Sequence, residues 1–137
     1  MSIKKSLEFL KENETCVLAT ATNNGKPQAA TVGYSIDEDF NFLIGTNKIT
    51  RKYQNLKNNN KIALVVGFAG SKTVQLEGTA RELEITDKRV EAHLNKLPSA
   101  VKFKIHPGQT YFLIKPTWLR FTDYSSKQQI FETKDFS

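Results

Sequence analysis

The chain has 137 residues, a formal net charge of +6 and a pI near 9.4. Its length suits one domain with its own core, and its positive charge favours anionic partners without choosing among phosphorylated ligands, nucleic acid and a membrane surface. The single cysteine, Cys16, excludes an intramolecular disulfide, and no apolar run approaches the roughly 20 residues that cross a membrane. We therefore expect one cytoplasmic domain, residues 1–137, without a membrane partner.

The first third of the chain predicts a helix and a meander of three strands. Residues 1–13 carry apolar side chains at helical spacing. Strand composition follows at residues 15–22, 27–36 and 40–46. The Asn24-Gly25 pair between the first two strands is typical of the turn that closes a hairpin.

The next segment predicts a short helix, because Ile49, Tyr53 and Leu56 share one face at helical spacing. Two cations, Arg51 and Lys52, lie side by side in its first turn. A helix N-terminus already carries a partial positive charge and free N–H groups, so two cations are unfavourable there unless an anion binds.

The rest of the chain predicts further strands and a second strong helix. Residues 61–68 are apolar on both faces, which favours a central strand or a strand covered by another subunit. Residues 73–85 alternate regularly, and Gly78 within them suggests a bulge or bend. Residues 86–98 follow with a buried helical stripe, ended by Pro98.

Residues 110–124 supply one or two closing strands, and the polar tail, residues 125–137, is expected to be poorly ordered. About six strands with short turns and two or three helices predict a mainly β fold with flanking helices. A small closed or nearly closed barrel is the expected architecture, with the helices over its ends or one flank.

One face of the second strand carries only small side chains, namely Ala29, Thr31, Gly33 and Ser35. The neighbouring strand ends in Gly45 and Thr46. Small side chains let a flat ring approach the backbone, whose N–H and C=O groups can bond the ring's edge. Close packing against a helix or a second sheet explains the same pattern.

The start of the short helix combines the groups of an anion site. Thr46, Asn47 and Thr50 supply hydroxyl and amide groups beside Arg51 and Lys52. A solvated basic helix is the alternative interpretation. A flat platform next to a phosphate site predicts a ligand with both parts, such as a flavin or another nucleotide.

Other polar residues give weaker signals. Gln75 could read the edge of a heterocycle or be an ordinary exposed strand residue. His93 and His106 lack the spacing of a metal site and are expected at the surface, and Cys16 is expected in the core. Trp118 is expected in the core, at an interface or at the lip of a pocket. We predict no metal site and assign no catalytic residue.

The order and spacing of three segments resemble the pyridoxamine 5′-phosphate oxidase-like family of FMN-binding split barrels. These segments are "LATATNNGKPQAATVGY", "FNFLIGTNKITRKYQNLKNNNKIALVV" and "VQLEGTAREL". The resemblance covers residues 2–124. It implies a six-stranded Greek-key split barrel that forms a homodimer, with two FMN molecules in clefts at the subunit interface.

The resemblance also implies cofactor contacts. Arg51 and Lys52 match the phosphate-binding pair, Gly45 and Thr46 match neighbours of the cofactor, and Gln75 matches a glutamine that faces the flavin. The segment that lines the ring corresponds to Ala30, Thr31, Val32 and Gly33. Asn47 and Thr50 at the helix start complete the predicted set.

Two departures argue against pyridoxamine phosphate oxidation itself. The vitamin B6 oxidases proper carry basic residues at both ends of the second-strand segment, where this chain has Ala30 and Ser35. They also carry a C-terminal substrate-binding segment with Arg and His, which is missing after Trp118. Since some relatives in this family prefer a deazaflavin or haem, the resemblance also implies these two as alternative cofactors.

The leading functional hypothesis is an FMN-binding homodimer that acts as a flavin-dependent oxidoreductase on a small molecule, with the flavin carrying the redox chemistry. A flavin store, carrier or sensor without turnover would use the same site. A basic nucleic-acid-binding barrel ranks third, because the aromatic residues mostly occupy apolar alternation positions rather than an exposed basic face.

Overall fold

A computed structural model describes residues 1–67, 70–125 and 127–137 of the protein. The strands are β1 (Thr15–Ala21), β2 (Pro27–Gly33), β3 (Ser35–Ile36), β4 (Phe42–Asn47), β5 (Lys61–Val66), β6 (Lys72–Leu83), β7 (Gln109–Asp123) and β8 (Gln129–Thr133). The helices are α1 (Ile3–Glu12), α2 (Arg51–Asn58), α3 (Lys88–Lys96) and the 3-10 helix η1 (Pro98–Phe103). Within these residues, no helix has the length and apolar character that a membrane crossing needs.

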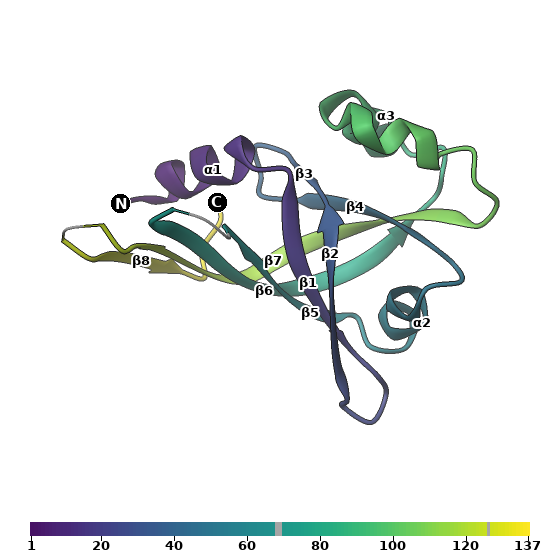
Figure 1. The fold of residues 1–137 in the computed structure, drawn as a ribbon, viewed down its shortest axis with the longest axis horizontal. Helices are drawn as coiled ribbons and strands as arrows, with labels where there is room; N and C mark the ends of the chain where they lie inside the picture. Colours follow the sequence, from purple (N-terminus) through teal and green to yellow (C-terminus); the bar gives the residue numbers. More distant parts are fainter. Residues whose placement is uncertain (68–69, 126) are drawn as a thin grey trace.

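The strands form one antiparallel sheet in the order β2-β1-β5-β6-β7-β4-β3, with β8 added to β7. The sheet curls into a half-barrel, so that β2 and β4 contact each other although neither pairs with the other (Figure 1). The predicted mainly β fold with flanking helices is confirmed. The six-strand count is wrong, because the described residues contain eight strands.

The two extra strands have separate causes. The predicted strand 27–36 breaks at Tyr34, whose N–H donates to the Glu14 carbonyl at 2.9 Å and so leaves the ladder between β2 and β3. The tail, in contrast to the expectation of poor order, contains β8, and Phe136 packs against Phe40 with ring centroids 5.5 Å apart. Residue 126 of the tail, like Phe68 of the predicted strand 61–68, lies outside the described residues.

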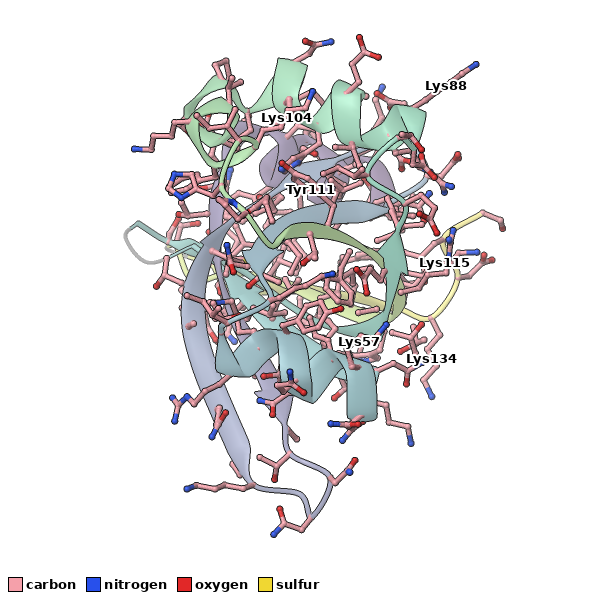
Figure 2. The ribbon with its side chains drawn as sticks, turned by 90° about the vertical axis from the view of Figure 1, so that its right-hand side faces the viewer. Lys57, Lys88, Lys104, Tyr111, Lys115 and Lys134 are labelled. Atoms are coloured by element: carbon pink, nitrogen blue, oxygen red, sulfur yellow. The ribbon has the colours of Figure 1, made fainter. Side chains whose placement is uncertain are left out.

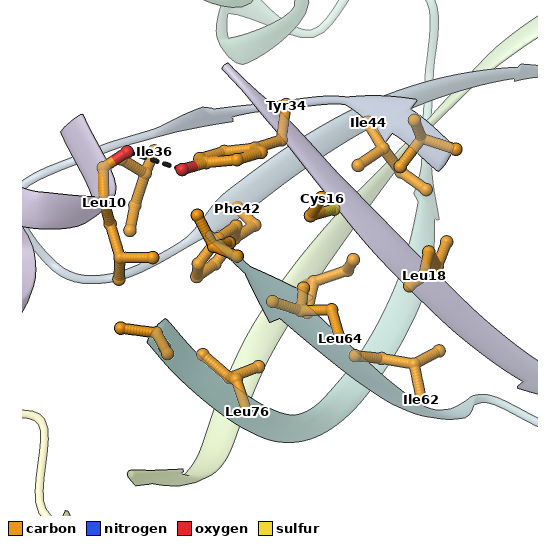
Figure 3. Packing of buried hydrophobic residues seen from close by; sticks show 14 of the residues in the cluster. Leu10, Cys16, Leu18, Tyr34, Ile36, Phe42, Ile44, Ile62, Leu64 and Leu76 are labelled. Carbon is orange, nitrogen blue, oxygen red and sulfur yellow. Dashed lines mark hydrogen bonds between the residues drawn. The ribbon is translucent and has the colours of Figure 1, made fainter. Parts of the chain in front are cut away.

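The main core fills the concave face of the sheet (Figure 3). Alternate residues of the strands point inward, as the period-2 pattern predicts, among them Cys16, Leu18, Ile62, Leu64, Val74 and Leu76. Helix α1 closes one end of this core. Tyr34 fixes it there, because its hydroxyl donates to the Leu10 carbonyl at 2.6 Å.

The irregularity predicted at Gly78 is confirmed, but its extra residue, Thr117, lies in β7 rather than in β6. The register between β6 and β7 shifts between Glu77 and Gly78. A Cβ atom at Gly78 would lie 2.4 Å from the Lys115 carbonyl oxygen, so only glycine fits this close approach. The bend lets one long strand pair run around the half-barrel.

A second, smaller core lies on the outer face of β4, β6 and β7, where α3 covers it. It contains Leu43, Leu83, Val90, Leu94, Tyr111 and Leu113. Residues 110–114 of β7 are therefore buried on both faces. Helix α3 begins at Lys88, because the side chain of Asp87 caps it by accepting from the Arg89 N–H at 2.9 Å.

Helix α2 begins at Arg51, and Thr50 caps it by accepting from the Tyr53 N–H at 3.3 Å. The two cations are thus the first two residues of the helix, as predicted. The inward face is formed by Tyr53 and buried Leu56. The predicted third member, Ile49, is wrong: it precedes the cap, outside the helix, and is 91% exposed.

Candidate functional site

A cleft of about 530 Å³ opens between α2 and α3, on the side of the molecule where β2 and β4 approach each other. We call it the α2–α3 cleft. Figure 2 looks onto this side, with Tyr111 between the two helices. Residues 98–103 of η1 contribute Ser99, Ala100, Lys102 and Phe103 to its rim. Its volume is in the range of small-molecule and cofactor sites.

The cleft lies at a gap in the sheet. Of the described strands, β2 pairs only with β1, and the stretch of β4 from Ile44 to Asn47 pairs only with β7. Each of these two strands therefore turns an open edge towards the gap. Backbone N–H and C=O groups along such edges can bond the rim of a flat ligand.

Eight of the eleven predicted cofactor-binding residues line this cleft. They are Thr31, Val32, Gly33, Gly45, Thr46, Asn47, Thr50 and Lys52. The curl of the sheet brings the β2 members next to the β4 members and the start of α2. That these residues bind a cofactor stays a prediction.

The predicted hydroxyl and amide groups build the start of α2 themselves. Thr46 Oγ1 and Thr50 Oγ1 lie 2.8 Å apart, and Thr50 Oγ1 also donates to the Asn47 carbonyl at 2.9 Å. The Asn47 amide donates to the Pro107 carbonyl at 2.9 Å and its oxygen accepts from the Ile49 N–H. The groups left for an anion are therefore the first-turn N–H groups and the cations.

Lys52 is the cation at this end of the cleft. It is half-buried, and desolvation lowers its pKa. Neither Lys52 nor Arg51 belongs to any ion pair among the described residues, and the first turn of α2 contains no acidic residue. An anion bound here would offset both the desolvation and the unfavourable helix dipole.

Arg51 and Ala30 lie beside the cleft rather than in it. Both line a separate depression of about 80 Å³, and Lys52 lines both cavities. The side chain of Asn55 ties α2 to this wall, because its amide donates to Thr20 Oγ1 and Gln28 Oε1 at 2.9 Å each. Exposed Arg51 is thus close to the cleft entrance without lining it.

Gln75 lies elsewhere, on the convex outer face of the sheet. The register links Thr31 to Val17, Val17 to Val65 and Val65 to Gln75. Three interstrand steps separate Thr31 from Gln75, which is roughly 14 Å. Gln75 instead borders a shallow groove of about 230 Å³ together with half-buried Trp118.

The small residues of β2 and β4 are also explained by packing. A Cβ at Gly33 would lie 3.0 Å from Leu97 Cδ2, and one at Gly45 would lie 2.7 Å from Gln109 Nε2. The alternative of close packing therefore accounts for these two glycines. Among the other small residues, Thr31 is exposed on the cleft wall.

His93 is a cleft residue that the sequence analysis placed wrongly at the surface. It is 2% exposed, and its Nδ1 lies within hydrogen-bonding distance of Ser35 Oγ, at 2.6 Å. Burial, with a smaller effect from Lys96, lowers its pKa to about 4. The sequence did contain a signal for its burial, because His93 falls three residues after Val90, within the buried stripe of α3.

Tyr111 is the second cleft residue that was missed. It is 1% exposed, and the His93 ring packs edge-on against it with centroids 5.9 Å apart. Its hydroxyl is buried and has no hydrogen-bond partner among the described residues. Burial raises the pKa of Tyr111, and the nearby Gln109 side chain reduces this rise. No hydrogen bond joins the two side chains.

The cleft thus has two chemically different ends. At the start of α2 it offers N–H groups and the Lys52 ammonium, which forms no ion pair with the described residues. Below α3 it offers a neutral phenol and a neutral imidazole. A ligand with an anionic group and an uncharged polar ring matches this arrangement. FMN has both parts, so the residues present fit this cofactor.

Solved structures with the same fold include proteins of different described roles. A haem-binding protein of Mycobacterium smegmatis matches with a TM-score of 0.78 and 18% identity, over 96% of this chain and 58% of that one. The haem storage protein HutZ of Vibrio cholerae matches with a TM-score of 0.72 and 13% identity, over 96% and 94%. A putative pyridoxamine 5′-phosphate oxidase of Listeria innocua matches with a TM-score of 0.72 and 19% identity, over 87% and 96%.

At these identities the likenesses establish the fold alone, and the chain spans only 58% of the mycobacterial protein. Among curated proteins, none matches the chain. The sequence model of one family, pyridoxamine 5′-phosphate oxidase, matches residues 3–123, which is most of the chain. The protein therefore belongs to the pyridoxamine 5′-phosphate oxidase family.

Proposed function

We propose that the protein binds FMN in the α2–α3 cleft and acts, as a homodimer, as a flavin-dependent oxidoreductase on a small molecule. The observation that carries the proposal is Lys52, a half-buried ammonium without a carboxylate partner among the described residues. It stands in the first turn of a helix, at the end of a cleft of cofactor size.

The phosphate of FMN would bind at the start of α2. The N–H groups of its first turn and the Lys52 ammonium would hold it, with Arg51 near enough to add a second charge at the entrance. The ring would lie in the gap between β2 and β4, against Thr31 and the open strand edges. When bound, FMN would supply electron and hydride transfer, while the chain binds, orients and shields it.

The convex face of the sheet supports the homodimer. Ala63 is exposed there, and Val17, Val65 and Trp118 are half-exposed around the shallow groove. Apolar side chains gathered on one sheet face favour burial against a partner. A second copy on this face would cover them together with Gln75, which borders the same groove.

Haem binding without turnover is the second candidate. Two proteins with this fold are a haem-binding and a haem storage protein, and the carboxylates of haem could pair with the same Lys52. A flavin carrier without turnover would share the FMN site, so only turnover assays with a reductant separate it from the oxidoreductase.

The test is a titration of the purified protein with FMN and, separately, with hemin, followed by flavin fluorescence and haem absorption. Lys52→Ala is compared with Lys57→Ala, which removes the same charge from the far end of the same helix. We expect Lys52→Ala to weaken FMN binding about tenfold or more, since a charge-assisted hydrogen bond contributes roughly 1.5–3 kcal/mol. Lys57→Ala should leave the affinity within about twofold.

Absence of FMN binding by the wild-type protein would refute the proposal. A haem absorption band together with that absence would favour the second candidate. Equal FMN affinities of the two variants would show that the anion site is elsewhere.

A further inference from the structure

The Tyr111 hydroxyl needs a partner that the described residues do not supply. It is the one buried side-chain nitrogen or oxygen atom among them that makes no hydrogen bond. Such groups are rare in folded proteins, because burying a polar atom without a partner is unfavourable. Since Tyr111 also lines the α2–α3 cleft, a ligand in the cleft is a natural partner.

The surroundings hold the Tyr111 ring in place, and none of the described residues around it forms a hydrogen bond with its hydroxyl. Leu43, Leu94 and Leu113 pack in the same small core. The neighbouring imidazole of His93 already uses its Nδ1 on Ser35. Directly across the β4–β7 ladder lies Gly45, which has no side chain to offer.

The chemistry around the hydroxyl selects the kind of atom it would bind. Next to the hydroxyl lie the buried, neutral His93 and the apolar small core, whereas the cation on this side of the cleft, Lys102, is exposed on η1 at the rim. A phenol at this position best serves as a donor to an uncharged acceptor, such as a carbonyl oxygen or a ring nitrogen.

One ligand can reach both ends of the cleft. Strand β4 runs from Gly45, opposite Tyr111, to Asn47 at the turn before α2. These two strand residues span only roughly 7 Å. A ligand whose phosphate lies at α2 therefore extends its ring towards Tyr111.

We propose that Tyr111 is a positioning residue whose hydroxyl donates a hydrogen bond to a carbonyl oxygen or ring nitrogen of the flavin ring. This inference rests on the proposed function, and it adds a ring contact that is independent of the phosphate. Tyr111 sets the depth at which the ring lies in the cleft, whereas Lys52 holds the phosphate at the other end.

The test compares FMN with riboflavin, which has the same ring but no phosphate. Tyr111→Phe is measured beside Tyr53→Phe, which also removes one phenolic oxygen, but one that donates to Glu82 outside the cleft. We expect Tyr111→Phe to weaken both ligands by about fivefold. Lys52→Ala should weaken FMN alone, and Tyr53→Phe should weaken neither.

The ligand-free proteins provide a second readout. Because Tyr111→Phe removes a hydroxyl without a protein partner, its melting temperature should equal or exceed that of the wild type. A lower melting temperature would show that the hydroxyl has a structural partner, and would overturn the inference.

Failure of the inference and failure of the proposed function are distinguishable. If the wild type binds FMN and Tyr111→Phe binds both ligands as tightly as Tyr53→Phe does, the Tyr111 contact is wrong and the proposed function stands. If the wild type binds neither FMN nor riboflavin, the proposed function and this inference both fail.

Discussion

The buried imidazole of His93 makes a quantitative prediction about stability in mild acid. In the unfolded chain its pKa is 6.5, whereas in the folded protein burial lowers it to about 4. Below pH 6.5 the unfolded state binds a proton that the folded state does not. The contribution of the neutral His93 imidazole to the free energy of unfolding is therefore fully present above pH 6.5, and it is lost as the pH falls towards 4.

The magnitude follows from the two pKa values. A difference from 6.5 to about 4 corresponds to about 3 kcal/mol, of which about 2 kcal/mol is already lost at pH 5. A loss of this size is substantial for a domain with a free energy of unfolding of roughly 5–15 kcal/mol.

Urea unfolding at pH 7.5 and pH 5.0 measures the effect. The wild type is compared with His93→Gln, which cannot titrate, and with His106→Gln, which removes the exposed histidine instead. The wild type and His106→Gln should each lose about 2 kcal/mol more than His93→Gln between the two pH values. Equal losses in all three proteins would refute the reasoning, because carboxylates common to all of them would then explain the pH dependence.

Three further predictions concern the fold and the assembly. Gly78→Val places a Cβ 2.4 Å from the Lys115 carbonyl oxygen. It should therefore lower the free energy of unfolding, measured in urea, by about 2 kcal/mol or more, whereas Thr79→Val, one residue on, should lower it by less than about 1 kcal/mol. Tyr34→Phe removes the 2.6 Å hydrogen bond to the Leu10 carbonyl and should cost about 1–2 kcal/mol in the same assay, and an unchanged stability would contradict this contact. Val65→Glu on the convex face should convert the proposed dimer into a folded monomer in sedimentation analysis, and a wild type that is monomeric at high concentration would exclude the dimer.

Local patterns in the sequence account for much of the fold. The alternation along β6 correctly predicts Val74, Leu76 and Ala80 inside, because a strand with one buried face needs period 2. The start of α2 is equally local, since Thr50 is a favourable cap. These features depend on residues within a few positions of one another.

Other features depend on distant parts of the chain. The break at Tyr34 is set by the Glu14 carbonyl, and the tail strand β8 exists because β7 extends far enough to pair with it. The distance of Gln75 from the cleft follows from the strand order of the sheet, which places β1 and β5 between β2 and β6. Spacing along the chain contains no such information.

The candidate site was predictable on one side only. The sequence marked the residues of β2, β4 and α2, because small side chains and misplaced cations are unusual in themselves. The α3 side was missed. Finding His93 required treating it as part of the Val90 and Leu94 stripe, and nothing in the sequence indicates that the Tyr111 hydroxyl lacks a partner.

A crystal structure of the protein with FMN tests the central claim most directly, because it locates the phosphate. We predict that the phosphate contacts the first-turn N–H groups of α2 and the Lys52 ammonium, with the ring in the gap between β2 and β4. FMN bound with its phosphate away from α2, or an empty α2–α3 cleft at saturating FMN, would contradict the account.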